Sequence, residues 1–87
     1  MITSAQIRAA RALLGIDQRS LAEASGLSLP TIQRMEASDG LVQGNVGSLV
    51  KVVDAIACAG VELIGSGAAS VDGGCGVRLK QKIELAE

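Results

Sequence analysis

The sequence predicts an all-α bundle of four to five short helices, followed by a small C-terminal β-strand element that is expected to form dimers. Three observations lead to this class. Apolar residues recur at helical spacing through most of residues 3–59, capping residues separate the periodic segments, and the period changes to strict alternation after residue 60. The 87-residue chain therefore divides into a helical domain at 1–60, a strand and glycine-rich dimerisation element at 61–80, and a tail at 81–87.

The first two helices are predicted over residues 3–14 and 18–24. In the first, strong helix formers carry an apolar stripe at intervals of three and four residues, and Thr3 or Ser4 is placed to act as N-cap. The second is shorter and begins after Asp17, whose side chain accepts hydrogen bonds well at an N-cap and whose charge suits a helix N-terminus.

Two further helices are predicted over residues 29–37 and 46–59, with Ser28 and Asn45 as their N-caps. Pro30 would be the second residue of the third helix, where its missing N–H has no intrahelical partner in any case. The buried stripe of the fourth helix is predicted to contain Leu49, Val53, Ile56 and Ala57.

Two short strands are predicted at "VELI", residues 61–64, and "VRLK", residues 77–80, on either side of a segment with five glycines in twelve residues. The strands could pair within one chain. Pairing across a two-fold axis is the expectation, because an isolated hairpin is marginal in water and a dimer covers the strand edges. The apolar face that would serve this dimer consists of Val61, Leu63, Val77 and Leu79.

The composition excludes several classes of function. Hydrophobic residues make up 48% of the chain, yet Phe, Tyr, Trp and His are all absent. Without aromatic rings there is no platform for stacking single-stranded bases, and without histidine the commonest general base and metal ligand is missing. Cys58 and Cys75 are too few for a structural zinc site and are interpreted as two free thiols. We therefore expect no enzyme, no metal and no cofactor.

The charge and hydropathy patterns indicate a soluble cytoplasmic protein. No apolar run approaches the ~18 residues of a membrane span. The net charge is −1, and residues 1–60 carry five basic and five acidic side chains. This balance is unfavourable for a nucleic-acid-binding protein, which is normally basic. Any affinity for DNA must come from the local placement of charge and from helix N-termini.

A helix, a glycine-containing turn and a second capped helix follow one another between residues 17 and 37, which predicts a helix-turn-helix. Ala22 is small where the second helix must cross closely, and Gly26 allows a left-handed turn. Leu21 and Ile32 are placed to hold the two helices at a fixed angle. One side of the second helix would then project outward.

The segment "DQRSLAEASGLSLPTIQRME" resembles the XRE, or Cro/lambda-repressor-type, helix-turn-helix family. It is similar to that family's pattern of Gln, two residues, Leu-Ala, three residues, Gly-hydrophobic-Ser, three residues, Ile, three residues and Glu. The resemblance extends over residues 4–60 and implies a lambda-repressor-like bundle. The glycine-rich segment and the "GVRLK" that follows look like the tail of small bacterial members of the same family, which is a weaker match.

The resemblance also implies roles for individual residues. Arg11 and Glu36 match a partly buried ion pair, and Gln18 matches a phosphate contact. The base-reading face of the third helix would carry Arg34 for guanine and Thr31 for a base edge or a thymine methyl. Further members of this DNA-contacting set are Arg19, Ser28, Leu29, Pro30, Gln33, Gln43, Asn45 and Ser48.

Two positions depart from the family pattern and weaken the expected phosphate anchoring. Leu29 stands where a polar or basic residue is common, and Asp39 lies in a loop that often carries Lys or Arg. The function implied is that of a bacterial, nucleoid-associated transcriptional regulator, a repressor that binds a palindromic operator as a homodimer. The alternatives are an antitoxin that binds a toxin through its C-terminal segment, and an adaptor that contacts a protein such as RNA polymerase without binding DNA.

Overall fold

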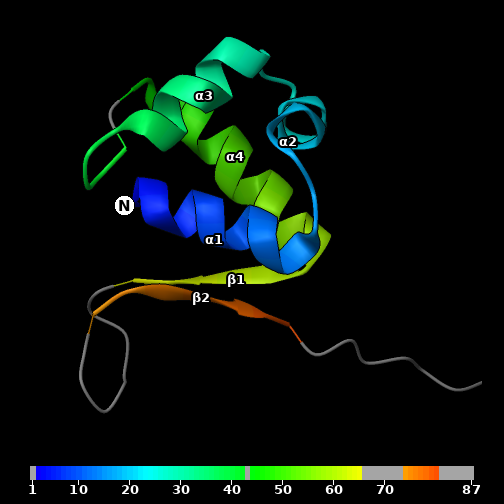
Figure 1. Ribbon diagram of the computed structural model, residues 1–87, viewed down its shortest axis with the longest axis vertical. Helices are drawn as coiled ribbons and strands as arrows, with labels where there is room; N and C mark the ends of the chain where they lie inside the picture. The colour runs from blue at the N-terminus through cyan, green and yellow to red at the C-terminus, as the bar shows by residue number, and fades with distance from the viewer. Residues whose placement is uncertain (1, 43, 66–73, 81–87) are drawn as a thin grey trace, which may run out of the picture.

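Four helices and a two-stranded antiparallel sheet make up the computed structural model, which describes residues 2–42, 44–65 and 74–80 (Figure 1). The predicted class, an all-α helix-turn-helix bundle with a small C-terminal β element, is confirmed. The elements follow the chain as α1 Ser4–Leu14, α2 Gln18–Ser25, α3 Leu29–Ala37, α4 Val46–Ala59, β1 Val61–Ile64 and β2 Gly76–Leu79. The second strand begins and ends one residue earlier than predicted.

Each helix begins at a side-chain cap. Thr3, Asp17, Ser28 and Asn45 all have extended backbones, and their side-chain oxygens accept hydrogen bonds from N–H groups in the first turn of the helix that follows. Such a bond satisfies a donor that has no partner inside the helix, and it contributes about 1 kcal/mol. Because both partners lie within three residues of each other, these helix starts follow from local sequence.

One apolar core lies between the four helices and the hairpin. Its fully buried side chains come from almost every element, so that no helix is stable without its neighbours. In the absence of aromatic residues, the space is filled by aliphatic side chains and one methionine. The buried apolar residues are Ile2, Ile7, Ala10, Leu21, Ala22, Ile32, Met35, Val42, Leu49, Val52, Ile56 and Val61.

The stripe that α4 contributes to this core differs from the prediction at two positions. Val52 is fully buried, whereas Val53 is only half-buried and Ala57 is exposed. The predicted stripe was centred about 50° around the helix axis from the buried face. Ten of the fourteen residues of α4 are apolar, so the periodicity of the sequence alone does not distinguish the buried face from its neighbour.

The helices α2 and α3 form the predicted helix-turn-helix. Gly26 ends α2 in the left-handed region, with φ of 75°, where a side chain would strain the backbone. Ala22 and Leu21 on α2 and Ile32 on α3 are buried together in the core, which fixes the crossing of the two helices. As a result, the N-terminal half of α3 projects from the body of the molecule (Figure 1).

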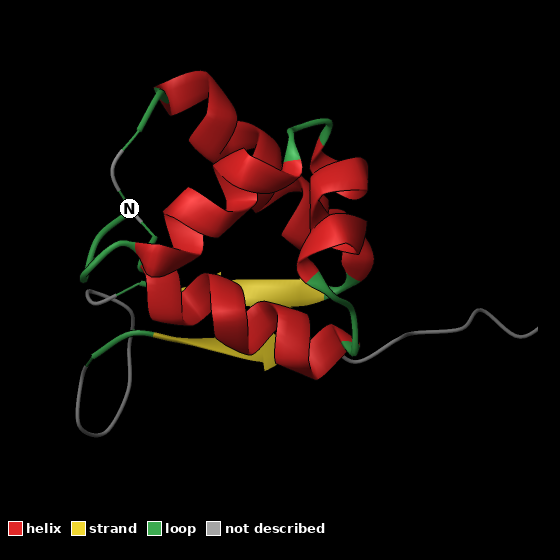
Figure 2. Ribbon diagram, turned by 45° about the horizontal axis from the view of Figure 1, so that its top comes forward, coloured by secondary structure: helices red, strands yellow, loops and turns green. Residues whose placement is uncertain are grey.

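The strands β1 and β2 pair with each other within one chain, so the expectation that they pair across a dimer axis is corrected. Val61 lies opposite Leu79 and Leu63 opposite Val77, which places all four predicted dimerisation residues on one face. Figures 1 and 2 show this hairpin lying against the helices, on the side of α1 away from α3. Val61 is fully buried, and Leu63 and Val77 pack on the core.

The apolar face of the hairpin is therefore occupied by the chain's own helices. Leu79 is the member of the set that stays exposed, at 53%. On the outer face of the hairpin, Arg78 forms an exposed ion pair with Glu62. The helices thus cover the apolar face of the hairpin, which a second subunit was expected to cover.

A buried glutamine, Gln6, ties the hairpin to α1. Its side-chain oxygen accepts the backbone N–H of Thr3 at 2.9 Å, which completes a capping box. Its amide nitrogen donates to the carbonyl oxygens of Ile64 and Gly76, at 3.0 and 2.9 Å. These two carbonyls belong to the paired residues at the end of the hairpin. One side chain therefore provides hydrogen-bond partners for a backbone N–H at the start of α1 and for two carbonyls at the end of the sheet. The sequence did not reveal this role.

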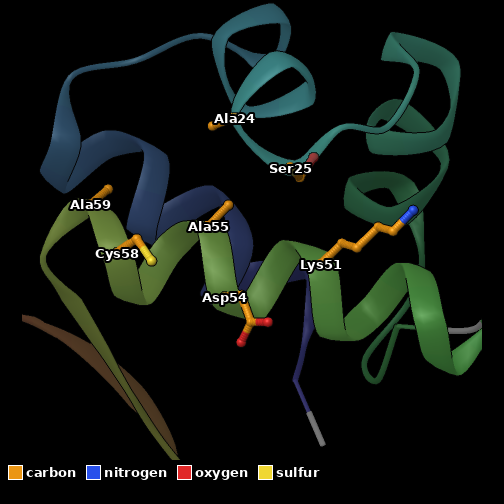
Figure 3. Close-up of a pocket in the computed structure, with 7 residues that line it drawn as sticks. All are labelled: Ala24, Ser25, Lys51, Asp54, Ala55, Cys58 and Ala59. Atoms are coloured by element: carbon orange, nitrogen blue, oxygen red, sulfur yellow. The ribbon is translucent and has the colours of Figure 1, made fainter.

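The two cysteines are free and exposed, as interpreted from the sequence. Figure 3 shows Cys58 on α4, in an open groove of about 490 Å³ between α2 and α4. Lys51 and Asp54 line the same groove. Cys75 lies beside the start of α1, in a second shallow groove. The described residues contain no group of three or more His, Cys, Asp or Glu side chains that could hold a metal ion.

Candidate nucleic-acid interface

The exposed side of α3 carries most of the residues predicted to read base edges. Pro30, Gln33 and Arg34 are exposed, while Leu29 and Thr31 are half-buried. The opposite side of α3 points into the core through Ile32, Met35 and Glu36. An amphipathic helix of this kind, anchored on one side and polar on the other, has the dimensions that fit the major groove.

The N-terminus of α3 carries a side-chain cap and a proline. The hydroxyl of Ser28 accepts the backbone N–H of Thr31 at 3.3 Å, and the two hydroxyl oxygens lie 2.8 Å apart. Pro30 occupies the second helical position, where its ring restricts the backbone without removing a helical hydrogen bond. The proline is therefore compatible with the helix and stiffens the end that would enter a groove.

Arg34 is extended along the exposed face of α3, where its Nη2 donates to the hydroxyl of Thr31 at 3.3 Å. The remaining donors of its guanidinium have no protein partner among the described residues. A guanidinium that is fixed at one nitrogen keeps enough donors for a bidentate contact with a guanine edge. Arg34 therefore keeps exposed donors that a nucleic-acid contact could use.

The start of α4 lies beside this face. Asn45, whose side chain accepts the N–H groups of Gly47 and Ser48, closes the first turn of α4. A shallow cavity of about 220 Å³ separates that turn from Thr31 and Arg34 on α3. The structure thus brings together predicted contact residues from two helices, although they are up to seventeen positions apart in the chain. Gln43, also predicted as a contact, lies outside the described residues.

The N-terminus of α2 carries two more of the predicted contacts, Gln18 and Arg19. Arg19 is exposed and free to reach a phosphate. The side chain of Gln18, in contrast, is already engaged, because its amide nitrogen donates to Oε1 of Glu36 at 3.1 Å. The amide has a second N–H that remains for a phosphate oxygen. Glu36 therefore orients Gln18, an arrangement that the sequence alone did not show.

A buried network joins α1, α2 and α3 behind this face. Arg11 donates from Nε to Oε2 of Glu36 at 2.6 Å and from Nη2 to Oε1 at 2.8 Å, which is a bidentate contact. The side chain of Glu36 is 4% exposed and that of Arg11 is 22% exposed. Arg11 also donates to the carbonyl of Ile16, at the end of the loop that leads into α2. The network fixes the position of α3 relative to the other two helices.

Arg8 supplements this network and was not selected by sequence reasoning. Its Nη1 donates to the backbone carbonyl of Glu36, near the C-terminal end of α3. The last carbonyls of a helix lack intrahelical partners and carry a partial negative charge, so a cation there is favourable. Arg8 lies on α1, one turn before Arg11, and this spacing along one helix face is the signal that could have identified it.

These contacts determine the ionisation of the network. Burial alone would raise the pKa of Glu36, but the hydrogen bonds from Arg11 and Gln18 and the nearby positive charges outweigh it and lower this pKa. The hydrogen bond to Glu36 raises the pKa of Arg11 in turn. The backbone N–H of Ser20 lowers the pKa of Asp17 at the N-cap of α2. Both carboxyl groups are therefore stabilised in the charged form.

Acidification is expected to destabilise the fold through Glu36. Because its folded pKa lies below its unfolded value, the contribution to stability is present above the unfolded pKa of about 4.3 and is lost as the pH falls through the folded pKa. Urea denaturation at pH values from about 7 to about 3 measures this loss. A Glu36→Gln variant should lose less stability on acidification, whereas the exposed control Glu23→Gln should behave like the parent. If Glu36→Gln and the parent lose the same stability between pH values of about 7 and about 3, Glu36 is not the group responsible.

A helix-turn-helix whose second helix is exposed, capped and anchored by a buried ion pair defines a class of DNA-binding domain. Residues 7–43 match the family model described as helix-turn-helix. This segment is a helix-turn-helix of the XRE/Cro type, a family of DNA-binding regulators that are generally not enzymes. A search of curated proteins found no match of significant similarity. In the part of the chain that the structure describes, no helix has the length and apolar character needed to cross a bilayer.

Proposed function

We propose that this protein is a sequence-specific transcriptional regulator that binds double-stranded DNA as a homodimer and represses a promoter by occupying a palindromic operator. It would act in the cytoplasm, on the nucleoid. The observation that carries the proposal is the presentation of α3, on which Arg34 is exposed and Thr31 is half-buried beside it, while the other side of the helix is fixed in the core.

Recognition would be divided between base edges and phosphates. Arg34 would bond to O6 and N7 of guanine, and Thr31 and the apolar pair Leu29 and Pro30 would contact thymine methyl groups. Phosphate contacts would come from the N-termini of α2 and α4, because the positive end of a helix favours an anion. The side chains that would contact phosphates are Gln18 and Arg19 at the start of α2, Ser28 and Gln33 at α3, and Asn45 and Ser48 at the start of α4.

A dimer follows from the size of the recognition element. One α3 helix can contact only a few base pairs, which does not specify a site in a genome. Two helices related by a two-fold axis and separated by ~34 Å read the two halves of a palindrome one helical turn apart. Repression by occlusion needs no further domain, since a bound dimer blocks a promoter that overlaps its operator.

Selection of bound sites from random double-stranded DNA, followed by footprinting, tests this function. We expect enrichment of a two-fold symmetric sequence whose half-sites lie about ten base pairs apart. Circular dichroism of the protein used in the selection would show that it is folded. If folded protein enriches no sequence, the regulator function is wrong.

The affinity for DNA is expected to depend only weakly on salt. Arg19 and Arg34 bring two positive charges to the face, and Arg8 and Arg11 are engaged with Glu36. We therefore expect about 3–5 neutralised phosphates per dimer, and a slope of log K against log salt of about −3 to −5. Titrations at several salt concentrations give the slope directly. A slope near −10 would show that many more phosphate contacts form.

A protein-interaction adaptor is the second candidate, and the apolar leading end of α3 favours it. Leu29 and Pro30 occupy the first turn, where polar side chains would strengthen DNA binding, and the net charge is −1. An adaptor would bind a protein such as RNA polymerase through this end. An antitoxin would instead bind a toxin through the C-terminal segment while keeping the DNA-binding face. The random-DNA selection separates the adaptor from the other two, and a toxin gene beside this one would favour the antitoxin.

A further inference from the structure

Residues 2–4, which lead into α1, lie across the loop that joins α3 to α4, and we call them the N-terminal strap. Thr3 of the strap forms an antiparallel bridge with Leu41 of the loop. Figures 1 and 2 show the start of α1 beside this loop. The strap therefore ties the beginning of the helical domain to a segment that is distant in the chain.

Two backbone hydrogen bonds flank this bridge and hold the loop against the strap. The N–H of Ser4 donates to the carbonyl of Gly40, and the N–H of Val42 donates to the carbonyl of Ile2, each at 3.0 Å. The side chains of Ile2 and Val42 are both buried in the apolar core. Because alternate side chains of paired segments point to the same side, one row of the pairing faces the core and anchors the loop there.

The side chain of Ser4 attaches the loop at a third point. Ser4 is 3% exposed, and its hydroxyl donates to the carbonyl of Ser38 at 2.7 Å. Ser38 is the C-cap of α3, where the chain leaves the helix with an extended backbone. Its own hydroxyl donates to the carbonyl of Arg34 in the last turn of α3, at 3.1 Å. The hydroxyl of Ser4 therefore helps to fix the direction in which the chain leaves α3.

The loop leads into the candidate nucleic-acid interface. It ends at Asn45, the N-cap of α4, and Ser48 follows in the first turn of that helix. Both residues line the shallow cavity that Thr31 and Arg34 of α3 also line. The helix α3 packs on α1 and α2, whereas α4 packs on α2 and β1. Direct packing between α3 and α4 is slight, so the position of the start of α4 relative to α3 depends on the loop.

We propose that Ser4 is a positioning residue for DNA binding, which sets the start of α4 relative to the base-reading side of α3 by holding the loop between them. This inference rests on the proposed function, because it concerns how two parts of that interface are held in register. Ser4 is buried and cannot itself contact DNA, so it acts through the backbone of the loop. Contact groups are effective only when supporting hydrogen bonds keep them in the productive geometry.

The variant Ser4→Ala removes the hydroxyl and leaves the backbone hydrogen bonds of the strap. We expect its affinity for the selected operator to fall at least ~5-fold, because the phosphate contacts from α4 are displaced. The base preference and the slope of log K against log salt should stay those of the parent, because Arg34 and every other cation are kept. Titrations with the operator and its single-base variants at several salt concentrations measure all three quantities. If the base preference is lost as well, α3 itself is displaced and the inference is wrong.

The variant Gly40→Ala repeats the test from the loop side and replaces Ser4→Ala if that variant does not fold. Gly40 is exposed and has φ of 76°, a left-handed conformation in which a side chain is strained. The strain lies at the residue whose carbonyl accepts the N–H of Ser4. Gly40→Ala should therefore also lower the affinity for the operator at least ~5-fold, with an unchanged base preference. If every variant that folds binds like the parent, the inference is overturned.

The matched control is Ser25→Ala, at another buried serine. The hydroxyl of Ser25 donates to the carbonyls of Leu21 and Ala22, in its own helix and away from the loop. Urea denaturation compares the stability of the two serine variants. Ser25→Ala should bind the operator like the parent wherever it is folded. If it loses as much affinity as Ser4→Ala, the cause is general destabilisation and not the position of α4.

A double-mutant cycle on DNA affinity gives a readout that destabilisation alone would not change. Ser48→Ala removes a predicted phosphate contact at the start of α4, and Arg19→Ala removes one at the start of α2. The effect of Ser4→Ala should shrink from ~5-fold to ~2-fold or less when Ser48 is already replaced, and it should keep its size when Arg19 is replaced. Equal effects in all three backgrounds would contradict the positioning role.

Amide hydrogen exchange reports on the strap in the absence of DNA. In Ser4→Ala the N–H of Val42 should exchange at least ~10-fold faster than in the parent, whereas the N–H of Val52, on the buried side of α4, should exchange as before. Unchanged exchange at Val42 would show that Ser4 does not hold the loop. If the parent binds an operator and the folded variants bind it equally, the positioning role is wrong and the regulator function stands. If the folded parent enriches no DNA sequence, the regulator function fails and the positioning role fails with it.

Discussion

Replacement of Arg11 with methionine is expected to lower the free energy of unfolding by about 3–5 kcal/mol. Arg11 supplies both strong hydrogen bonds to Glu36, whose side chain is 4% exposed. Without the guanidinium, a nearly buried carboxylate keeps only the weaker bond from Gln18. Such a decrease is a large part of the 5–15 kcal/mol by which a domain is usually stable. Urea denaturation followed by circular dichroism measures it.

Replacement of the partner, Glu36, should lower the free energy of unfolding by less than replacement of Arg11 does. In Glu36→Gln the stranded group is Arg11, which is 22% exposed and can recover water. The double variant Arg11→Met/Glu36→Leu should be more stable than Arg11→Met alone, because an apolar pair replaces a buried charge without a partner. The destabilisation in Arg11→Met should also shrink at acidic pH, where Glu36 takes up a proton. A double variant no more stable than Arg11→Met would show that packing rather than the stranded charge dominates.

Replacement of Arg34 with alanine is expected to weaken binding to the selected operator by about 1–3 kcal/mol per contacted half-site and to relax the preference at one base position. The reason is the loss of two parallel hydrogen bonds from the guanidinium to O6 and N7 of guanine, which distinguish guanine from the other bases. Arg34 is exposed and contacts only Thr31 on its own helix, so the variant should fold normally. Binding titrations with the operator and with single-base variants of it give both quantities.

Arg19→Ala is the matched control for this prediction. Arg19 is also an exposed arginine, but it lies at the N-terminus of α2, where phosphate contacts are expected. Its replacement should weaken binding to all sequences by a similar factor and make the salt slope shallower by about one unit for each phosphate that is no longer neutralised. If Arg34→Ala shows this uniform pattern, Arg34 contacts the backbone and another residue reads the base.

The site could be predicted in part because two kinds of information coincided. Exposure of Arg34 and the capping of α3 by Ser28 follow from a local pattern of apolar and polar residues. The salt bridge between Arg11 and Glu36 was implied only by resemblance to a family, because no local rule pairs residues twenty-five positions apart. The engagement of Gln18 with Glu36 and the contribution of Arg8 came only from the structure.

The sequence by itself determined the four helices, their caps and the turn between α2 and α3, because each of these depends on residues within about four positions of one another. Tertiary structure alone decided which apolar face of α4 is buried, since ten of its fourteen residues are apolar. It also decided that β1 pairs with β2 in the same chain. The amide of Gln6 donates to the carbonyl of Ile64 in this hairpin, although Gln6 lies fifty-eight positions earlier in the chain. A strand edge can be covered by a second subunit or by the chain's own helices, and packing makes that choice.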